Sequence, residues 1–206
     1  MQLKKQVFWI LVLIMGLGGS GHTQPSPQHP KAICLIGQPG APIRLDVFSD
    51  YQCPSCRNFY LRTIKPLINE YGRTNQLCLN YFDLPLKRHK FAFEASRYGV
   101  AARQLGPDPW QKVSEALYEH QSEWSENGKI EAVVTAVLSD EEMVRLKKFL
   151  KDPSINQTIE REAALANERG VSMTPTFFLT VKGREKKVNG KVSYSILKEY
   201  IERMMK

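Results

Sequence analysis

The chain has 206 residues, 42% of them hydrophobic, which is enough apolar material for one domain with an insertion. Its 29 lysine and arginine residues outnumber its 21 aspartate and glutamate residues, which gives a formal net charge of +8. The basic residues are scattered and no nucleic-acid-binding motif accompanies them, so we expect acidic partners or anionic membrane surfaces rather than nucleic acid.

The first residues have the pattern of a secretory signal. Lys4 and Lys5 precede an apolar run at residues 7–17, and small residues follow it. We expect residues 1–24 to be a signal peptide. An uncleaved N-terminal membrane anchor is the alternative, although the run is shorter than the ~20 residues of a spanning helix. Residues 25–31 are polar and rich in proline, as in a tether, so the folded part is expected outside the cytoplasm, periplasmic or secreted, free or anchored.

Short strands and one helix are predicted after the tether. Strand patterns occur at residues 32–37 ("AICLIG"), 43–50 ("IRLDVFSD") and 76–84 ("QLCLNYFDL"). Between the last two, apolar side chains recur at helical spacing over residues 56–72, and Pro66 predicts a kink there.

The next stretch, from residue 89 to about residue 167, has a helical period throughout. Ser139 and Glu142 have the spacing of a capping box, which marks one helix start within it. A hairpin is then predicted at residues 174–190 with its turn near Gly183, and an amphipathic helix follows. This order predicts an α/β fold in which a block of helices interrupts a mixed sheet.

Two cysteines, Cys53 and Cys56, stand three positions apart with Pro54 and Ser55 between them. A zinc site would need two more ligands, and the sequence has no second pair at this spacing and no histidines at finger spacing, so no metal site is expected. A structural disulfide closing so short a loop would restrict the unfolded chain little. Thiol–disulfide exchange is the chemistry that the pair favours.

The position of the pair relative to the predicted helix assigns a role to each thiol. Cys53 would lie at the helix N-terminus, where unpaired backbone N–H groups and the helix dipole stabilise a thiolate, so Cys53 is the expected nucleophile. Cys56, one turn later, can attack a mixed disulfide on Cys53 and release the partner. Pro54 suits the first turn because its missing N–H is not needed there. No cofactor is expected.

Three stretches resemble the DsbA-like branch of the thioredoxin superfamily: "LDVFSDYQCPSC" at residues 45–56, "LYEHQSEWS" at residues 117–125 and "RGVSMTPTFFL" at residues 169–179. The resemblance extends over nearly the whole chain after the leader. It implies a thioredoxin-like α/β fold in two parts, residues 32–88 and 169–206, with an inserted all-helical domain at residues 89–168. It also implies an extracytoplasmic thiol–disulfide oxidoreductase that acts on protein thiols.

The resemblance implies roles for three more residues. Pro175 would be cis and face the disulfide, while the backbone of Thr174 would pair with a substrate chain. From the residues alone, an ordinary turn before a strand is the commoner interpretation, because only ~5–6% of X-Pro bonds are cis. Asp46 would be a buried acid beneath Cys56 that accepts its proton. The other interpretation is a carboxylate on a partly exposed strand face.

The remaining cysteines, Cys34 and Cys78, lie in the first and third predicted strands, which a thioredoxin-like order makes neighbours. A structural disulfide between them is our hypothesis, and two buried free thiols are the alternative. The basic stretch "KRHK" at residues 87–90 is expected to be a solvated turn, although the family often has a histidine at the position of His89.

Three functions compete on this pattern. The first is a disulfide donor to secreted or periplasmic proteins that a membrane-bound redox partner reoxidises. The second is a reductase or isomerase of the same fold, because Ser55 stands where strongly oxidising relatives have histidine. It ranks second because the sequence shows no separate dimerisation segment of the kind that isomerases often carry. A monomer is the default expectation. The third is a copper-binding thioredoxin-like protein, although such proteins usually have a late histidine and none follows His120.

Overall fold

The computed structural model describes residues 34–206. The predicted signal peptide or anchor at residues 1–24 and the tether at residues 25–31 lie outside the described residues. Within the described part, no helix is both long enough and apolar enough to span a bilayer.

Strands and helices follow one another in the predicted order. The elements are β1 (Ile36–Gly37), β2 (Ile43–Ser49), α1 (Pro54–Phe59), the π-helical turn η1 (Tyr60–Ile64), α2 (Lys65–Tyr71), β3 (Leu77–Asp83), α3 (Ala92–Leu105), α4 (Pro107–Glu119), α5 (Gln121–Asn127), α6 (Ile130–Thr135), α7 (Asp140–Phe149), α8 (Ser154–Glu168), β4 (Thr176–Val181), β5 (Arg184–Asn189) and α9 (Tyr194–Met205).

One mixed sheet of five strands organises this part of the chain, in the order β1-β3-β2-β4-β5. Strands β2 and β3 are parallel, and the helical crossover from α1 to α2 joins them. The other pairs, β1 with β3, β2 with β4 and β4 with β5, are antiparallel. The two edges differ, because β1 has only two residues whereas β5 has six, most of them exposed. The predicted α/β class with a helical insertion is confirmed.

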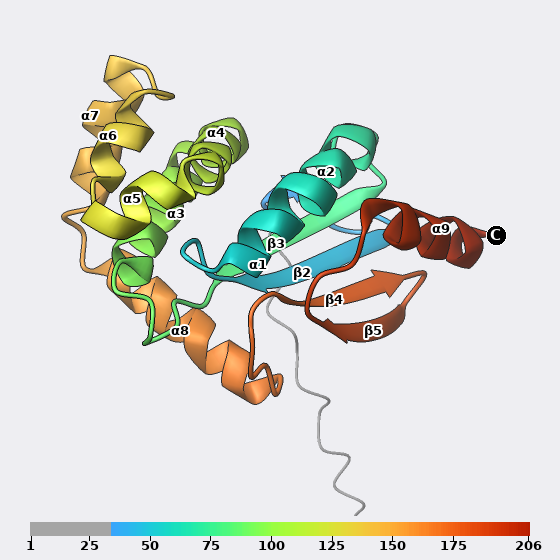
Figure 1. The fold of residues 1–206 in the computed structure, drawn as a ribbon. Coiled ribbons are helices and arrows are strands. Elements are labelled where there is room, and N and C mark those ends of the chain that lie inside the picture. The colour runs from blue at the N-terminus through green and yellow to red at the C-terminus, as the bar shows by residue number, and fades with distance from the viewer. Residues whose placement is uncertain (1–33) are drawn as a thin grey trace, which may run out of the picture. The chain divides into compact units, whose positions relative to one another are not determined.

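Helices cover both faces of the sheet (Figure 1). Leu45 and Val47 of β2 belong to the large core that α1, η1, α2 and α9 share with the sheet. Phe48 and Phe178 point to the opposite face, where they pack against Ala166 near the end of α8. Helices α3 to α7 lie together at the end of the sheet where α1 begins (Figure 1). The cysteine pair is therefore placed beside the helical block.

The helix after the cysteine pair contains an irregular turn. Instead of a simple kink at Pro66, the structure has the π-helical turn η1 just before it, where the Lys65 N–H bonds to the Tyr60 carbonyl five residues back. Pro66 has no N–H with which to continue the α-helical pattern onto Arg62, and the turn before it is the wider one.

The helical block contains one element whose ends the sequence pattern does not mark. Helix α5, inside the stretch predicted to be helical, has Trp124 as its one large apolar residue, so the pattern gives no separate start or end for it. Helix α4 begins directly after Gly106, with Pro107 in its first turn. The predicted capping box is present, since Ser139 accepts from the Glu142 N–H and the Glu142 side chain accepts from the Ser139 N–H.

A disulfide joins Cys34 to Cys78, 44 positions later, and ties the start of the described chain to β3. The expected first strand, residues 32–37, is shorter in the structure, and Cys34 precedes β1 rather than lying in it. The segment with Cys34 nevertheless lies next to β3, as expected, because the Leu35 N–H donates to the carbonyl of Leu79 on β3 at 2.8 Å.

A buried group of charges joins the sheet to the helical block. Arg103 of α3 contacts Asp83 at the end of β3 and donates to Glu162 of α8 at 2.6 Å. Burial raises the pKa of Asp83 to about 8, and the charge of Glu162 acts in the same direction, whereas Arg103 opposes the rise. Two carboxylates thus share one guanidinium in the interior.

Candidate active site

The cysteine pair lies where the loop after β2 enters α1. Cys53 is the N-cap residue of α1, with extended backbone angles φ −78° and ψ 121°, and Pro54 occupies the first turn. The loop is tight, because the Cys53 N–H bonds to the Asp50 carbonyl at 3.1 Å. Both thiols are free, and the residues are buried, with Cys53 5% exposed and Cys56 fully enclosed.

The environment of Cys53 favours its thiolate. The pKa of Cys53 is lowered to about 5, chiefly by a hydrogen bond with the Cys56 side chain. Burial opposes this shift, and the backbone N–H groups of Cys56 and Ser55 add to it, as expected at a helix N-terminus. At neutral pH, Cys53 is therefore an ionised nucleophile.

The environment of Cys56 favours the protonated thiol. Burial raises the pKa of Cys56 well above its ordinary value, and the neighbouring Cys53 acts in the same direction. The Ser49 side chain and the backbone of Asp50 oppose the rise through hydrogen bonds. The pair therefore consists of one ionised and one protonated sulfur, as nucleophilic attack followed by resolution requires.

The loop before β4 lies against the nucleophile. The Thr174–Pro175 peptide bond is cis, and the Thr174 carbonyl oxygen lies 3.6 Å from Cys53 Sγ. The fold thus brings together two segments 121 positions apart. Met173, just before them, is 46% exposed. The roles of Thr174 and Pro175 toward a substrate chain stay predictions.

Side chains of the helical block fix the loop that carries Cys53. Gln121 of α5 donates through Nε2 to the carbonyls of Tyr51 at 2.6 Å and of Cys53 at 3.1 Å. Arg57 of α1 donates to the Tyr118 carbonyl at 2.7 Å. Sequence reasoning missed Gln121, although it lies inside one of the stretches that carry the resemblance.

Asp50, next to the pair, accepts several hydrogen bonds and is fully buried. One carboxylate oxygen lies 2.7 Å from His89 Nδ1 and accepts from the Leu86 N–H at 2.8 Å, and the other accepts from the Gln52 N–H at 2.7 Å. The expected solvated turn at residues 87–90 is present, since Lys87, Arg88 and Lys90 are exposed, but His89 departs from it because its ring contacts the loop that carries the nucleophile.

Asp46 is buried, but it does not lie beneath Cys56. Its carboxylate accepts from Asn80 at 2.7 Å, from Arg44 at 3.0 Å and from Arg169 at 2.9 Å. Asp46 lies between Leu45 and Val47, whose side chains point into the core that contains Cys56. Successive side chains of a strand point to opposite faces, so the Asp46 side chain points to the other face of the sheet. The predicted proton acceptor is therefore wrong, and Asp46 is instead the centre of a hydrogen-bonded charge cluster.

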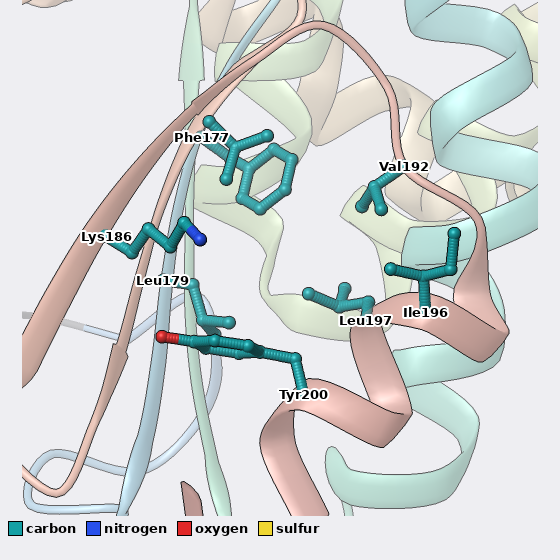
Figure 2. Close-up of a pocket in the computed structure, with 8 residues that line it drawn as sticks. Phe177, Leu179, Lys186, Val192, Ile196, Leu197 and Tyr200 are labelled. Carbon is teal, nitrogen blue, oxygen red and sulfur yellow. The ribbon is translucent and has the colours of Figure 1, made fainter. Parts of the chain in front are cut away.

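An apolar pocket of about 230 Å³ opens between the β4–β5 hairpin and α9. Figure 2 shows side chains from both elements converging on it. The residues that line it are Phe177, Leu179, Lys186, Val188, Val192, Ile196, Leu197 and Tyr200. Neither cysteine of the pair belongs to this lining. Over residues 34–206, no group of three or more His, Cys, Asp or Glu side chains is arranged to bind a metal ion.

Comparison with known proteins gives a consistent picture. A family model described as thioredoxin matches residues 30–203. Disulfide bond formation protein D of Bacillus subtilis is 23% identical over 182 residues, which cover 84% of this chain and 77% of that protein. Probable disulfide bond formation protein D of Bacillus cereus is 22% identical over 152 residues, which cover 70% of this chain and 68% of that protein.

Solved structures with DsbA in their names share the fold. Wolbachia pipientis alpha-DsbA1 superposes with a TM-score of 0.67 at 17% identity, covering 82% of this chain and 89% of that one. Pseudomonas aeruginosa DsbA2 gives a TM-score of 0.62 at 21% identity, and the superposition covers 82% of this chain and 92% of that one. At these identities, the structural likeness establishes the arrangement of the backbone.

Proposed function

This chain belongs to the thioredoxin family as a DsbA-like protein disulfide oxidoreductase, and from this premise we propose that it donates disulfides to secreted or periplasmic proteins through Cys53 and Cys56. The observation that carries the proposal is the unequal ionisation of the two thiols. A reduced form that is stabilised by a low-pKa thiolate makes the corresponding disulfide a stronger oxidant.

The reaction has two exchange steps. A substrate thiolate attacks Cys53 Sγ, the Cys53–Cys56 bond breaks, and Cys56 leaves with the electron pair and takes up a proton. The second substrate thiolate then attacks the substrate sulfur of the mixed disulfide, and Cys53 leaves as the thiolate. The substrate is oxidised by two electrons and the cysteine pair is reduced by two. The low pKa of Cys53 makes it a good leaving group in the second step.

The position of Thr174 supports a binding role in these steps. Its carbonyl lies at the nucleophilic sulfur, so an extended substrate segment that pairs with this backbone would bring its own cysteine to Cys53. We propose this role for Thr174, with Pro175 setting the direction of the strand that follows.

We further propose that the protein works outside the cytoplasm and is reoxidised there by a membrane-bound redox partner. The leader pattern supports export, and the Cys34–Cys78 disulfide fits an oxidising compartment. In this proposal, residues 32–88 and 169–206 form the thioredoxin-like part and residues 89–168 form the insertion.

One observation favours a second candidate, a disulfide reductase or isomerase. Ser55 lies between the two cysteines and supplies no positive charge to Cys53. The residues between the cysteines influence the reduction potential, which among known proteins of this chemistry extends from ~−120 mV for DsbA to ~−270 mV for thioredoxin.

Equilibration with glutathione would distinguish the two functions. The protein would carry Cys34→Ala and Cys78→Ala, so that only the Cys53/Cys56 pair titrates. A potential above about −180 mV supports the donor, and a potential near about −270 mV contradicts it and favours the reductase. Oxidative refolding of a reduced disulfide protein, with Cys53→Ser as the control, would test the activity itself.

A further inference from the structure

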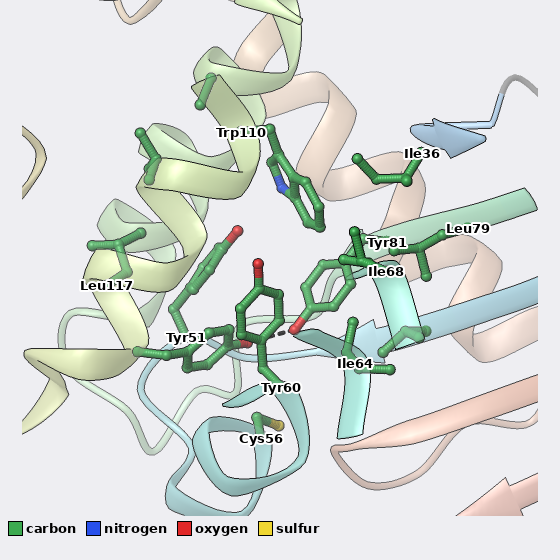
Figure 3. Close-up of a cluster of buried hydrophobic side chains, with 14 of the residues drawn as sticks. Ile36, Tyr51, Cys56, Tyr60, Ile64, Ile68, Leu79, Tyr81, Trp110 and Leu117 are labelled. Atoms are coloured by element: carbon green, nitrogen blue, oxygen red, sulfur yellow. Dashed lines mark hydrogen bonds between the residues drawn. The ribbon is translucent and has the colours of Figure 1, made fainter. Parts of the chain in front are cut away.

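Three buried hydroxyl groups form a chain next to the cysteine pair. Ser49 Oγ at the end of β2 lies 2.9 Å from Tyr118 Oη of α4, which lies 2.7 Å from Tyr81 Oη of β3. Each of these residues is at most 2% exposed. We call Ser49, Tyr118 and Tyr81 the hydroxyl chain. Figure 3 shows Tyr81 among the aromatic side chains that pack over Cys56.

The hydroxyl chain ends at Cys56. Ser49 occupies the same face of β2 as Val47, in the core that also contains Cys56, and its hydroxyl is near enough to the Cys56 thiol to lower the pKa of that thiol. Burial raises the pKa of both Tyr118 and Tyr81 well above the ordinary value, so their hydroxyls stay protonated. All members of the chain can therefore donate.

The number of protons makes this arrangement suited to a charged sulfur. Three hydroxyls have three protons, and the two bonds within the chain use two of them. When Tyr81 donates to Tyr118 and Tyr118 donates to Ser49, the third proton, on Ser49, is directed at Cys56. Hydroxyl protons rotate without displacement of heavy atoms, so the chain can reverse when Cys56 is a protonated donor.

We propose that the hydroxyl chain stabilises the thiolate of Cys56 during disulfide exchange, with Ser49 as a catalytic residue that donates to the sulfur and Tyr118 and Tyr81 as positioning residues. The proposal rests on the exchange function above. In the donor direction Cys56 leaves with the electron pair of the disulfide, and in the reverse direction it must lose a proton to attack. Both directions place a negative charge on a fully buried sulfur, where a hydrogen bond to a charged group is worth more than one to a neutral group.

The hydroxyl chain also explains how Cys56 can ionise although Asp46 is not next to it. The carboxylate of Asp46 points to the other face of the sheet and is bound by Arg169 and its neighbours. Neutral hydroxyls stabilise the thiolate without competing with it for charge, whereas a buried carboxylate would repel it unless protonated.

Stopped-flow reaction of the reduced pair with an aromatic disulfide, Ellman's reagent, separates the two steps. Cys53 attacks first and releases one aromatic thiolate. Cys56 then gives its proton to the buffer, attacks Cys53 Sγ in the mixed disulfide, forms the Cys53–Cys56 bond and releases a second aromatic thiolate. We expect Ser49→Ala and Tyr118→Phe to leave the first rate within about twofold. Ser49→Ala should slow the second rate by about tenfold, as loss of a hydrogen bond to a charged group predicts, and Tyr118→Phe, which removes a neutral hydrogen bond to Ser49, should slow it about threefold. The pH midpoint of the second rate should rise in both variants.

Tyr60→Phe is the matched control. The Tyr60 ring stacks on Tyr118 with centroids 4.9 Å apart, and its buried hydroxyl has no hydrogen-bond partner among the described residues. The Tyr60→Phe substitution removes a hydroxyl from the same aromatic cluster and leaves the hydroxyl chain intact. The rates of both thiolate-release steps should therefore stay at the wild-type values.

The outcomes separate the inference from the function. A wild-type protein that releases only one aromatic thiolate would contradict the exchange function itself. Unchanged second rates in Tyr118→Phe, with two thiolates released, would overturn the hydroxyl chain and leave the function standing. Equal slowing by Tyr60→Phe would assign the effect to packing and would also overturn it. If one variant fails to fold by circular dichroism, Tyr81→Phe gives the same test at the far end of the chain.

Discussion

The Cys56→Ala substitution tests why Cys53 is ionised. In the wild type the pKa of Cys53 is lowered from 9.0 to about 5, and the Cys56 hydrogen bond is the largest cause. A pKa near 5 leaves about 99% of the thiol ionised at pH 7, against about 1% for a pKa of 9. A hydrogen bond to a charged group is worth about 1.5–3 kcal/mol, which corresponds to about one to two pKa units. The variant is therefore expected to titrate at a pH of about 6–7.

The assay is the pH dependence of Cys53 alkylation by iodoacetamide, quantified by mass spectrometry. The midpoint of the profile reports ionisation, and the plateau reports intrinsic nucleophilicity, which falls with pKa, so the two effects are separable. Cys56→Ser keeps a hydroxyl donor and should give an intermediate midpoint. An identical midpoint in the wild type and Cys56→Ala would refute the reasoning, because the backbone N–H groups would then be sufficient. A wild-type midpoint near 8.5 would refute the low pKa altogether.

Ser55→His adds a cation beside the nucleophilic thiol, so we expect a lower alkylation midpoint and a less negative reduction potential; unchanged values would contradict the electrostatic argument. Replacing both Cys34 and Cys78 by alanine opens a loop of 44 positions and should lower the free energy of unfolding by about 4 kcal/mol on the chain-entropy estimate, checked by urea titration. Because the folded pKa of Asp83 is raised to about 8, its contribution to stability is full below the unfolded pKa of about 4 and is lost as the pH rises through 8. Asp83→Asn should therefore flatten the decrease in Tm between about pH 4 and pH 8, and a parallel decrease over that range would refute the assignment.

Local patterns predicted much of the fold and the position of the cysteine pair. The helical spacing after Cys56 and the Ser139–Glu142 capping box depend on residues close together in the chain, and the structure contains both features. The cysteine spacing was informative for the same reason, since the first turn of a helix is a local structure. The predicted roles of Thr174 and Pro175 came from resemblance, because an X-Pro bond gives no local sign of its isomer.

The errors arose where the fold decides which side of an element faces the site. Strand β2 is buried on both faces, so its sequence lacks the alternation that would assign Asp46 to one of them. The contact between Asp50 and His89 joins residues 39 positions apart, and that of Gln121 with the Cys53 loop joins residues 68 apart. Neither contact leaves a periodic signal, because each depends on how the helical block packs against the end of the sheet.

The two edges of the sheet have a consequence for the proposed disulfide donor, whose substrates would be unfolded chains. Exposed strand edges are templates on which unfolded segments aggregate, and short or charged edge strands are common protections against this. One edge here is the two-residue β1, and the other is β5, with the sequence "REKKVN" largely exposed to solvent. Among the described strands, therefore, little is offered at either edge to which another extended chain can add, and if the protein donates disulfides as proposed, it would meet unfolded substrates without templating their aggregation.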